Sequence, residues 1–473
     1  MIQLVNRQEN GIKVSFVKKE RLEEIQKSGG LSETFKADYL EALWLTNEQN
    51  EFTLYIGIGE EDLDCIQRKE IAAKAVKLCK EKELHKVSID ITDIINQYSA
   101  QAVFDLAEGA ILGQYNQRIF KDNQSSKMEI EFCNYNEEVQ EQVRAYMNDA
   151  ISIAEGICFA RDMVNLPANR LRPRDFAQEI CDFVKDTSIE TEVIYEEKLR
   201  EMGMDALLSV GESSQYPPCM LVMRYKGDPS SNRITGLVGK GVTVDTGGYC
   251  LKPSNSMLGI KGDMAGGAAV SAALYALAKN QVKTNAVAVI PMCENRISSG
   301  SMLPGDVIRS YSGKTIEIIN TDAEGRLILA DAVSYAVKDE GVTEILDIAT
   351  LTGAVVNMLG FSIGGAISDD DKWFDEFYKA YQKSGERYWR LPFYKEHEKM
   401  IESKIADIKN LGESHCGTIT AGLFIRAFAK ERPWLHLDIA GTAWVEPPIF
   451  EFQTKGATGA GVSSIYHLCN RED

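Results

Sequence analysis

The octapeptide at residues 320–327, Asn-Thr-Asp-Ala-Glu-Gly-Arg-Leu, contains the chain's densest group of reactive side chains. It places the carboxylates of Asp322 and Glu324 and the guanidinium of Arg326 within five positions. A strand-like run at 315–319 precedes it, and an apolar helical run follows. Ligands of α/β sheets bind at the carboxyl ends of strands, so this junction predicts a ligand site. For a D-x-E spacing alone, a solvated helix-capping turn is the alternative.

Two upstream segments supply further charged groups. A Gly-rich loop predicted at 239–252 carries Lys240, Asp245 and Lys252, and Asp263 directly precedes another helical run. With the two acids of the octapeptide, these segments deliver four carboxylates, which would repel one another at low dielectric without a counter-ion. Two divalent cations would balance the four negative charges, and oxygen-rich ligation with shared carboxylates is typical of two-metal hydrolytic sites.

Composition excludes several other classes of protein. The net charge of −18 and the pI near 5.0 make binding to nucleic acid or to an anionic membrane unfavourable. The apolar run around 265–278 is short for a bilayer span, and the N-terminus has no basic segment followed by an apolar core, so neither membrane insertion nor a signal peptide is expected. Ten cysteines without a C-x-x-C pair argue against a zinc ribbon or a disulfide framework and predict a cytoplasmic location.

Other catalytic patterns are absent from the sequence. The histidines have no H-E-x-x-H or H-x₃-H spacing, and no G-x-S-x-G marks a serine nucleophile. His436 lies in an apolar strand-like run and is predicted to be a core residue, while His415-Cys416 is interpreted as an ordinary loop pair. The segment around Lys240 fits neither the Walker A spacing nor the dinucleotide fingerprint, so phosphate binding is not predicted.

Alternating strand-like and helical runs predict an α/β protein of two domains. Residues 1–136 are expected to form a small N-terminal α/β domain, and 137–164 a linking helix with a 3.6-residue apolar period. Residues 165–473 are expected to form a larger domain with a central mixed sheet sandwiched by helices. The first domain carries no chemical motif.

The octapeptide, together with Gly-Lys-Gly-Val-Thr-Val-Asp-Thr-Gly-Gly at 239–248, the second lysine and Lys-x-Asp-Met at 261–264, resembles the leucyl aminopeptidase family, the cytosol aminopeptidases of peptidase family M17. Weaker matches extend the resemblance over about residues 155 to 465. The resemblance implies that 165–473 is a catalytic domain that releases N-terminal residues, leucine-like ones preferred, from peptides. It also implies a homohexamer, to whose assembly the first domain contributes.

The resemblance assigns roles to particular residues. Two divalent ions, Mn²⁺ or Zn²⁺, would be held by five side chains: Lys240, Asp245, Asp263, Asp322 and Glu324. Lys252 would stabilise the oxyanion of the reacting carbonyl, and Arg326 would hold a bicarbonate ion that moves a proton. The substrate cleft would be lined by Lys252, Thr350, Leu351 and Gly353. From residue types alone, Lys240 could instead form salt bridges to the carboxylates without ligating a metal.

Four positions depart from the family's commonest residues: Val244, Thr246, Cys250 and Ile260. None is an expected ligand, so they affect the preferred N-terminal residue and not the reaction class. Two alternatives from other classes remain: a DNA-binding or assembly protein on the same fold, which the acidic total charge opposes, and a dinuclear phosphoesterase, for which several histidine ligands would be expected.

Overall fold

The computed structural model describes residues 2–6, 12–27, 34–46, 52–117, 120 and 127–471. The chain divides into two compact units: Met1–Cys158 with Pro447–Thr454, and Phe159–Glu446 with Lys455–Asp473. The division falls within helix α5 (Gln140–Asn165), the helix that the sequence predicts as a linker. The domain limits 1–136, 137–164 and 165–473 stay a prediction. The grouping of Pro447–Thr454 with the first unit was not foreseen.

The first unit is built on a six-stranded sheet. Its strands, in spatial order, are β1 (Ile2–Leu4), β6 (Glu129–Cys133), β5 (Lys86–Asp90), β2 (Ile12–Lys18), β4 (Phe52–Gly59) and β3 (Ala42–Thr46). All neighbours are parallel except β3 and β4. The helices are α1 (Lys19–Lys27), α2 (Cys65–Glu81), α3 (Thr92–Tyr98), α4 (Ala102–Gly113), the 3₁₀ turn η1 (Glu137–Val139) and the start of α5.

The second unit contains a nine-stranded mixed sheet. Its strands, in spatial order, are β16 (Tyr388–Arg390), β15 (Gly364–Ser368), β18 (Trp434–Asp438), β14 (Glu344–Ala349), β9 (Thr235–Gly239), β11 (Asn285–Asn295), β8 (Cys219–Lys226) and β7 (Glu190–Tyr195), with β10 (Gly241–Asp245) beside β11. Two smaller sheets join β12 (Val307–Arg309), β13 (Thr315–Glu317) and β17 (Ile408–Lys409), and β19 (Trp444–Val445) with β20 (Gly456–Ala457).

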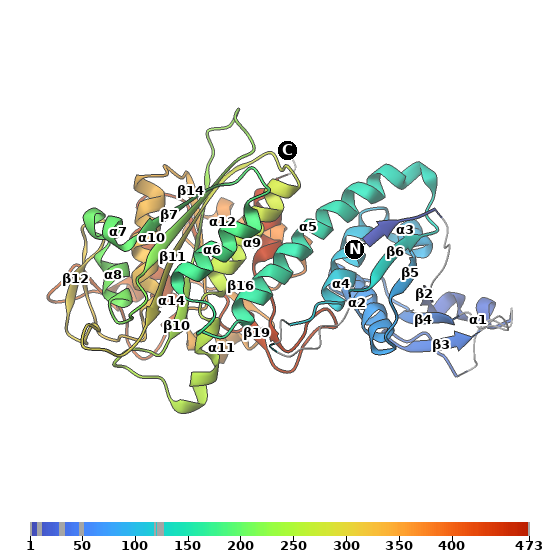
Figure 1. Cartoon of the computed structure of the whole chain (residues 1–473), viewed down its shortest axis with the longest axis horizontal. Helices are drawn as coiled ribbons and strands as arrows, with labels where there is room; N and C mark the ends of the chain where they lie inside the picture. Colours follow the sequence, from blue (N-terminus) through green and yellow to red (C-terminus); the bar gives the residue numbers. More distant parts are fainter. Residues whose placement is uncertain are drawn as a thin grey trace. The chain divides into compact units, whose positions relative to one another are not determined.

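Helices cover both faces of this sheet, which confirms the predicted architecture (Figure 1). On one face pack α6 (Pro173–Val184), α9 (Ala265–Lys279), α12 (Asp371–Ser384) and α15 (Val462–Cys469). On the other pack α8 (Asp205–Gly211), α10 (Gly325–Lys338) and α14 (Gly417–Arg426). The remaining elements are α7 (Glu196–Met202), η2 (Ser254–Gly262), α11 (Gly353–Leu359) and α13 (Lys395–Lys399).

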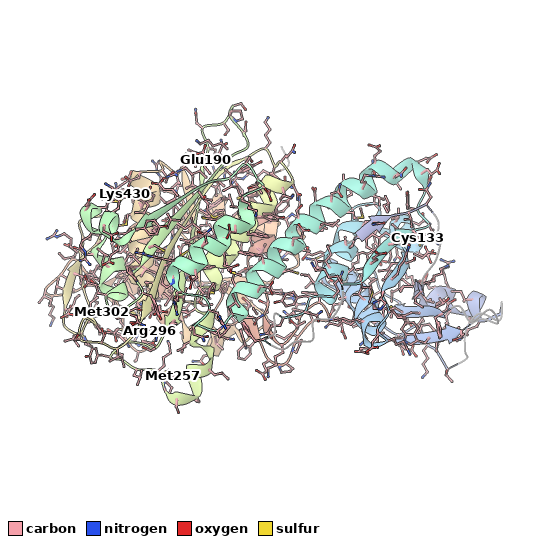
Figure 2. All side chains as sticks on the ribbon, in the orientation of Figure 1. Cys133, Glu190, Met257, Arg296, Met302 and Lys430 are labelled. Atoms are coloured by element: carbon pink, nitrogen blue, oxygen red, sulfur yellow. The ribbon has the colours of Figure 1, made fainter. Side chains whose placement is uncertain are left out.

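Five strands of the large sheet end at the same edge. β10, β11, β9, β14 and β18 are linked by parallel pairing, so their carboxyl ends lie together. Figure 2 shows Arg296, which follows β11, and Met257 of η2 at this end of the unit, and Glu190 and Lys430 at the opposite end. The predicted site residues therefore gather where an α/β sheet presents groups to a ligand.

One expectation about this edge was wrong. The sequence predicts a Gly-rich loop across 239–252, but residues Gly241–Asp245 form the buried strand β10. Their Val-Thr-Val centre is β-branched and pairs in parallel with β11, with Asp245 opposite Asn295. Glycine suggested a loop, whereas here Gly241 permits close packing, because a Cβ would lie 2.5 Å from the carbonyl oxygen of Pro291.

Candidate functional site

Three carboxylates converge at the carboxyl edge of the sheet. Asp245, Asp322 and Glu324 each present an oxygen atom, and these atoms all lie within 4.8 Å of one another. Asp245 ends β10, Asp322 lies in the loop after β13, and Glu324 is the residue before α10. Asp245 and Glu324 are buried. A tight turn thus brings both acids of the octapeptide to the acid of a distant strand.

Lys240 connects this cluster to the fourth acid, Asp263. Its Nζ lies 2.7 Å from Oδ2 of Asp263 and 2.9 Å from Oε1 of Glu324, and it donates to the carbonyl oxygen of Thr350 at 3.2 Å. The hydroxyl of Thr350 donates to Oδ1 of Asp263 at 2.8 Å. Gly325 leaves room for this side chain, because a Cβ there would lie 2.5 Å from Cε of Lys240 and displace it.

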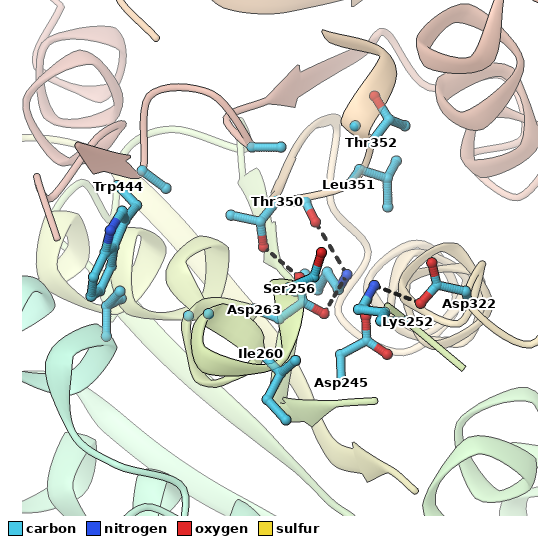
Figure 3. Close-up of a pocket in the computed structure, with 17 residues that line it drawn as sticks. Asp245, Lys252, Ser256, Ile260, Asp263, Asp322, Thr350, Leu351, Thr352 and Trp444 are labelled. Carbon is cyan, nitrogen blue, oxygen red and sulfur yellow. Dashed lines mark hydrogen bonds and ion pairs between the residues drawn. The ribbon is translucent and has the colours of Figure 1, made fainter. Parts of the chain in front are cut away.

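Lys252 approaches the cluster from the other side (Figure 3). Its Nζ lies 2.8 Å from Oδ2 of Asp245 and 2.5 Å from Oδ1 of Asp322. The structure therefore brings together the five side chains predicted as metal ligands and the lysine predicted to act beside them. In this arrangement both lysines form ion pairs with the carboxylates.

The electrostatics of the cluster favour additional cations. With all four carboxylates ionised, the two protonated lysines would leave two negative charges (−4 and +2) in a largely buried volume. Burial and the charge of Asp245 raise the pKa of Glu324 to about 8, despite Lys240, and burial raises the pKa of Asp263 to about 6. Oε2 of Glu324 is buried without a hydrogen-bond partner. These residues fit divalent metal ions, which would supply the missing charge and occupy the free oxygen.

Both lysines remain protonated in this setting. Burial lowers the pKa of Lys240, but the attraction of Asp263, Glu324 and Asp245 outweighs it, so the net shift is upward. For Lys252, burial is likewise outweighed by Asp245 and its neighbouring acids, and the pKa rises. Ligation of a metal by Lys240 therefore requires that the metal displace its proton.

Arg326, in the first turn of α10, is not among the residues that line the cavity over the cluster. Its side chain is buried, and Nη1 donates to the carbonyl oxygen of Asn410 at 2.8 Å, while Nε has no hydrogen-bond partner. Burial lowers its pKa to about 10 although Glu324 and Asp438 act in the opposite direction, so the guanidinium stays charged at neutral pH. One N–H group thus remains free to bind an anion.

This cavity has a volume of about 370 Å³. Thr350, Leu351 and Gly353, which follow β14, are among the residues that line it. Part of its wall is apolar: Ile260, which the sequence already marks as a departure from the family, lines it together with Val164, Ala440, Ala443 and Trp444, for which the sequence predicts no role. Trp444 lies across the cavity from Asp322 and Lys252 (Figure 3). The sequence feature that could have indicated this wall is that residues 440–444 directly follow the apolar run that forms β18.

The histidines lie outside this cluster. His436 is fully buried on β18 with Nδ1 2.5 Å from Oδ1 of Asp347, which confirms the predicted core position. His415 is exposed and lies 3.5 Å from Glu413. Among the described residues, the groups that could hold a metal comprise carboxylates alone, which does not favour the phosphoesterase alternative. No helix in the described ranges is both long and apolar enough to cross a membrane.

Comparisons with known proteins agree with this geometry. Residues 158–466 match the catalytic domain of the cytosol aminopeptidase family. The chain is 39% identical over 448 residues to a "Probable cytosol aminopeptidase" of Clostridium perfringens (93% of this chain, 91% of the relative) and 41% identical over 426 residues to one of Treponema denticola (89% of each). The solved structure of the bottromycin maturation enzyme BotP in complex with Mn is similar, with a TM-score of 0.88, 30% identity and coverage of 97% of this chain and 99% of that one.

The match to this catalytic domain, together with the carboxylates clustered at the carboxyl edge of the sheet, identifies a metal-dependent hydrolase. The chain belongs to the cytosol aminopeptidase family, peptidase family M17, and is an aminopeptidase of the leucyl aminopeptidase type. The alternative of a DNA-binding or assembly protein is not favoured by these comparisons.

Proposed function

We propose that the protein is a two-metal aminopeptidase that releases leucine-like residues from the N-termini of peptides. The observation that carries this proposal is the convergence of Asp245, Asp322 and Glu324 beside a cavity that two of these acids, Asp245 and Asp322, line together with an apolar wall. A peptide end would place its free amine and first carbonyl over the carboxylates and its first side chain toward the apolar wall.

The proposed metal ligands form two overlapping groups. Asp245, Asp322 and Glu324 would hold one ion, and Lys240 and Asp263 would complete the site of a second that shares Asp245 and Glu324. Mn²⁺ or Zn²⁺ bound there would supply a water of lowered pKa and an anchor for the substrate's amine. The similar enzyme BotP forms a complex with Mn, which supports Mn²⁺ as a candidate.

The remaining polar groups would act on the substrate and its protons. Lys252 would turn toward the oxygen of the scissile carbonyl, where its fixed positive charge stabilises the developing oxyanion. Thr350, Leu351 and Gly353 would contact the peptide backbone. Arg326 would hold bicarbonate through its unpaired N–H, and the bicarbonate would carry a proton between water and leaving group.

The apolar wall supports the proposed preference for leucine-like side chains. Val164, Ile260, Ala440, Ala443 and Trp444 carry no formal charge, so an acidic or basic side chain would lose hydration there without gaining an ion pair. Each buried methylene of the substrate would contribute about 0.8 kcal/mol. The wall therefore discriminates by burial and not by hydrogen bonding.

The proposal extends to assembly and location. The homohexamer is proposed from the resemblance to the family alone. A cytoplasmic location suits the cysteines of the described residues, all of which are free thiols. Analytical ultracentrifugation of the full chain measures the oligomeric state directly.

The main experiment is a panel of aminoacyl-p-nitroanilides assayed before and after removal of metals. Chelation should abolish hydrolysis, and Mn²⁺, Zn²⁺ or Co²⁺ should restore it to different levels. Leucyl and methionyl substrates should be hydrolysed faster than aspartyl or lysyl ones. Full activity in protein that elemental analysis shows to be metal-free would refute the proposal.

A further inference from the structure

Asn295, the last residue of β11, is tied to two other elements of the site and carries no expected role. Its side chain is 2% exposed, and its Nδ2 donates to Oδ1 of Asp245 at 2.9 Å and to the carbonyl oxygen of Thr321 at 3.0 Å. Its own carbonyl oxygen accepts from the main-chain nitrogen and the hydroxyl of Thr246, at 3.0 and 2.9 Å. One amide thus connects the ends of β10 and β11 with the octapeptide loop.

The hydrogen bond from Asn295 determines which oxygen of Asp245 remains available to a cation. Oδ1 accepts from Asn295 and also from the main-chain nitrogen of Gly247 at 3.0 Å. A carboxylate oxygen has about two lone-pair directions, so these two donors fill Oδ1. Oδ2 faces the cluster, where it meets Lys252 at 2.8 Å. The acceptor capacity left for a cation is therefore on Oδ2.

Thr321 extends the same connection to the next acid. Its hydroxyl donates to the carbonyl oxygen of Gly247 at 2.6 Å and accepts from the main-chain nitrogen of Cys250 at 2.8 Å. Asp322 follows directly in the chain. Asn295 and Thr321 together hold Asp245 and Asp322, which come from different elements, at a set separation.

We propose that Asn295 is a positioning residue that orients Asp245 so that Oδ2 faces the metals and that fixes the distance from Asp245 to Asp322. The inference rests on the proposed metal centre. An amide suits the task because it donates to the carboxylate without bringing a positive charge that would repel the metal ions. Partners that orient metal ligands in this way typically contribute about 10- to 100-fold in metal affinity.

The same strand provides a matched control. Asn285 begins β11, and its Nδ2 donates to the carbonyl oxygens of Asp228, Ser231 and Arg233 at 2.7, 3.0 and 3.4 Å. These bonds support a loop outside the carboxylate cluster and the cavity lining. Asn285→Ala therefore removes a comparable set of hydrogen bonds from the same strand without touching the site.

The test measures Mn²⁺ affinity of the metal-free full chain by isothermal titration calorimetry, with melting temperatures recorded in parallel. Asn295→Ala should weaken Mn²⁺ binding about 10- to 100-fold, whereas Asn285→Ala should lower the melting temperature and bind Mn²⁺ as the wild type does. Asn295→Ser serves as the second variant should the alanine protein not fold, with the same expected loss.

Each outcome has a separate meaning. Failure of the wild type to bind Mn²⁺ would refute the metal centre itself. Wild-type binding together with unchanged affinity in folded Asn295 variants would overturn the positioning role alone. If Asn285→Ala weakened Mn²⁺ binding equally, the positioning role would also be overturned, because the loss of affinity would then follow from the stability of the strand.

Discussion

Two regions of the molecule bury acids against bases, with opposite charge balance. Between α2 and α4 of the first unit, Arg68 lies 2.8 Å from Asp105 and Lys69 lies 2.7 Å from Glu108. Two acids face two bases there. In the second unit, four carboxylates face two lysines. The first arrangement is electrically complete, whereas the second requires further positive charge.

The comparison shows which observation identifies a metal site. Glu108 and Glu324 both have one buried carboxylate oxygen without a hydrogen-bond partner. Burial raises the pKa of Asp105 to about 6 even between Lys69 and Arg68, much as it raises that of Asp263. Orphaned oxygens and raised pKa values therefore occur in both regions. The excess of carboxylates, together with the cavity, distinguishes the catalytic region.

The largest expected contrast comes from removing one lysine in each region. Lys69→Ala leaves Glu108 buried and unpaired, which should lower the free energy of unfolding by about 3–5 kcal/mol. Lys252→Ala should leave stability and metal content near wild type but reduce kcat about 10²- to 10³-fold, because it removes the proposed oxyanion partner. Urea unfolding, elemental analysis and steady-state kinetics measure the three quantities. Loss of the metals from Lys252→Ala would show that its role is ligation.

A smaller effect should appear in metal-free protein carrying Glu324→Gln. The pKa of Glu324 is raised to about 8 in the fold, above its ordinary value of 4.5, so ionisation destabilises the folded state as pH rises through that interval. Glutamine does not ionise, so the variant does not lose this stability as the pH rises. The melting temperature of the variant should exceed that of wild type at pH 9 and equal it near pH 4, as measured by calorimetry after chelation.

In the first unit the corresponding change, Glu108→Gln, should destabilise the protein at pH 9, because it breaks the ion pair between Lys69 and Glu108. A rise in melting temperature for both variants, or for neither, would contradict the distinction between the two regions.

The smallest effect is expected at Arg326. Arg326→Ala should lower kcat while metal content stays unchanged, and Arg326→Lys should restore it in part, because an ammonium lacks the forked geometry of a guanidinium. In carbonate-depleted buffer wild type should slow and recover when bicarbonate is added, whereas Arg326→Ala should respond little. Equal bicarbonate dependence of kcat in both proteins would exclude Arg326 as the residue that holds the anion.

Much of the catalytic unit could be predicted from the sequence. The ligand types were visible because Asp322, Glu324 and Asp263 lie at transitions between regular elements, where periodic apolar runs stop and charged residues begin. The helical run expected after the octapeptide became α10 (Gly325–Lys338), and the strand-like run at 315–319 became β13 (Thr315–Glu317). Local periodicity contains this information, since it depends only on neighbouring residues.

Tertiary structure alone decided the rest. Gly241–Asp245 is a strand only because β11 pairs with it, and Asn295 contacts Asp245 only because that pairing sets the two residues opposite each other. Trp444 lines the cavity from a segment after β18, more than a hundred residues beyond the octapeptide. Sequence by itself determined the chemistry of the ligands and the family. Which oxygen of each acid stays free, and which residues hold that acid in place, depends on the long-range order of the strands. No local pattern encodes that order.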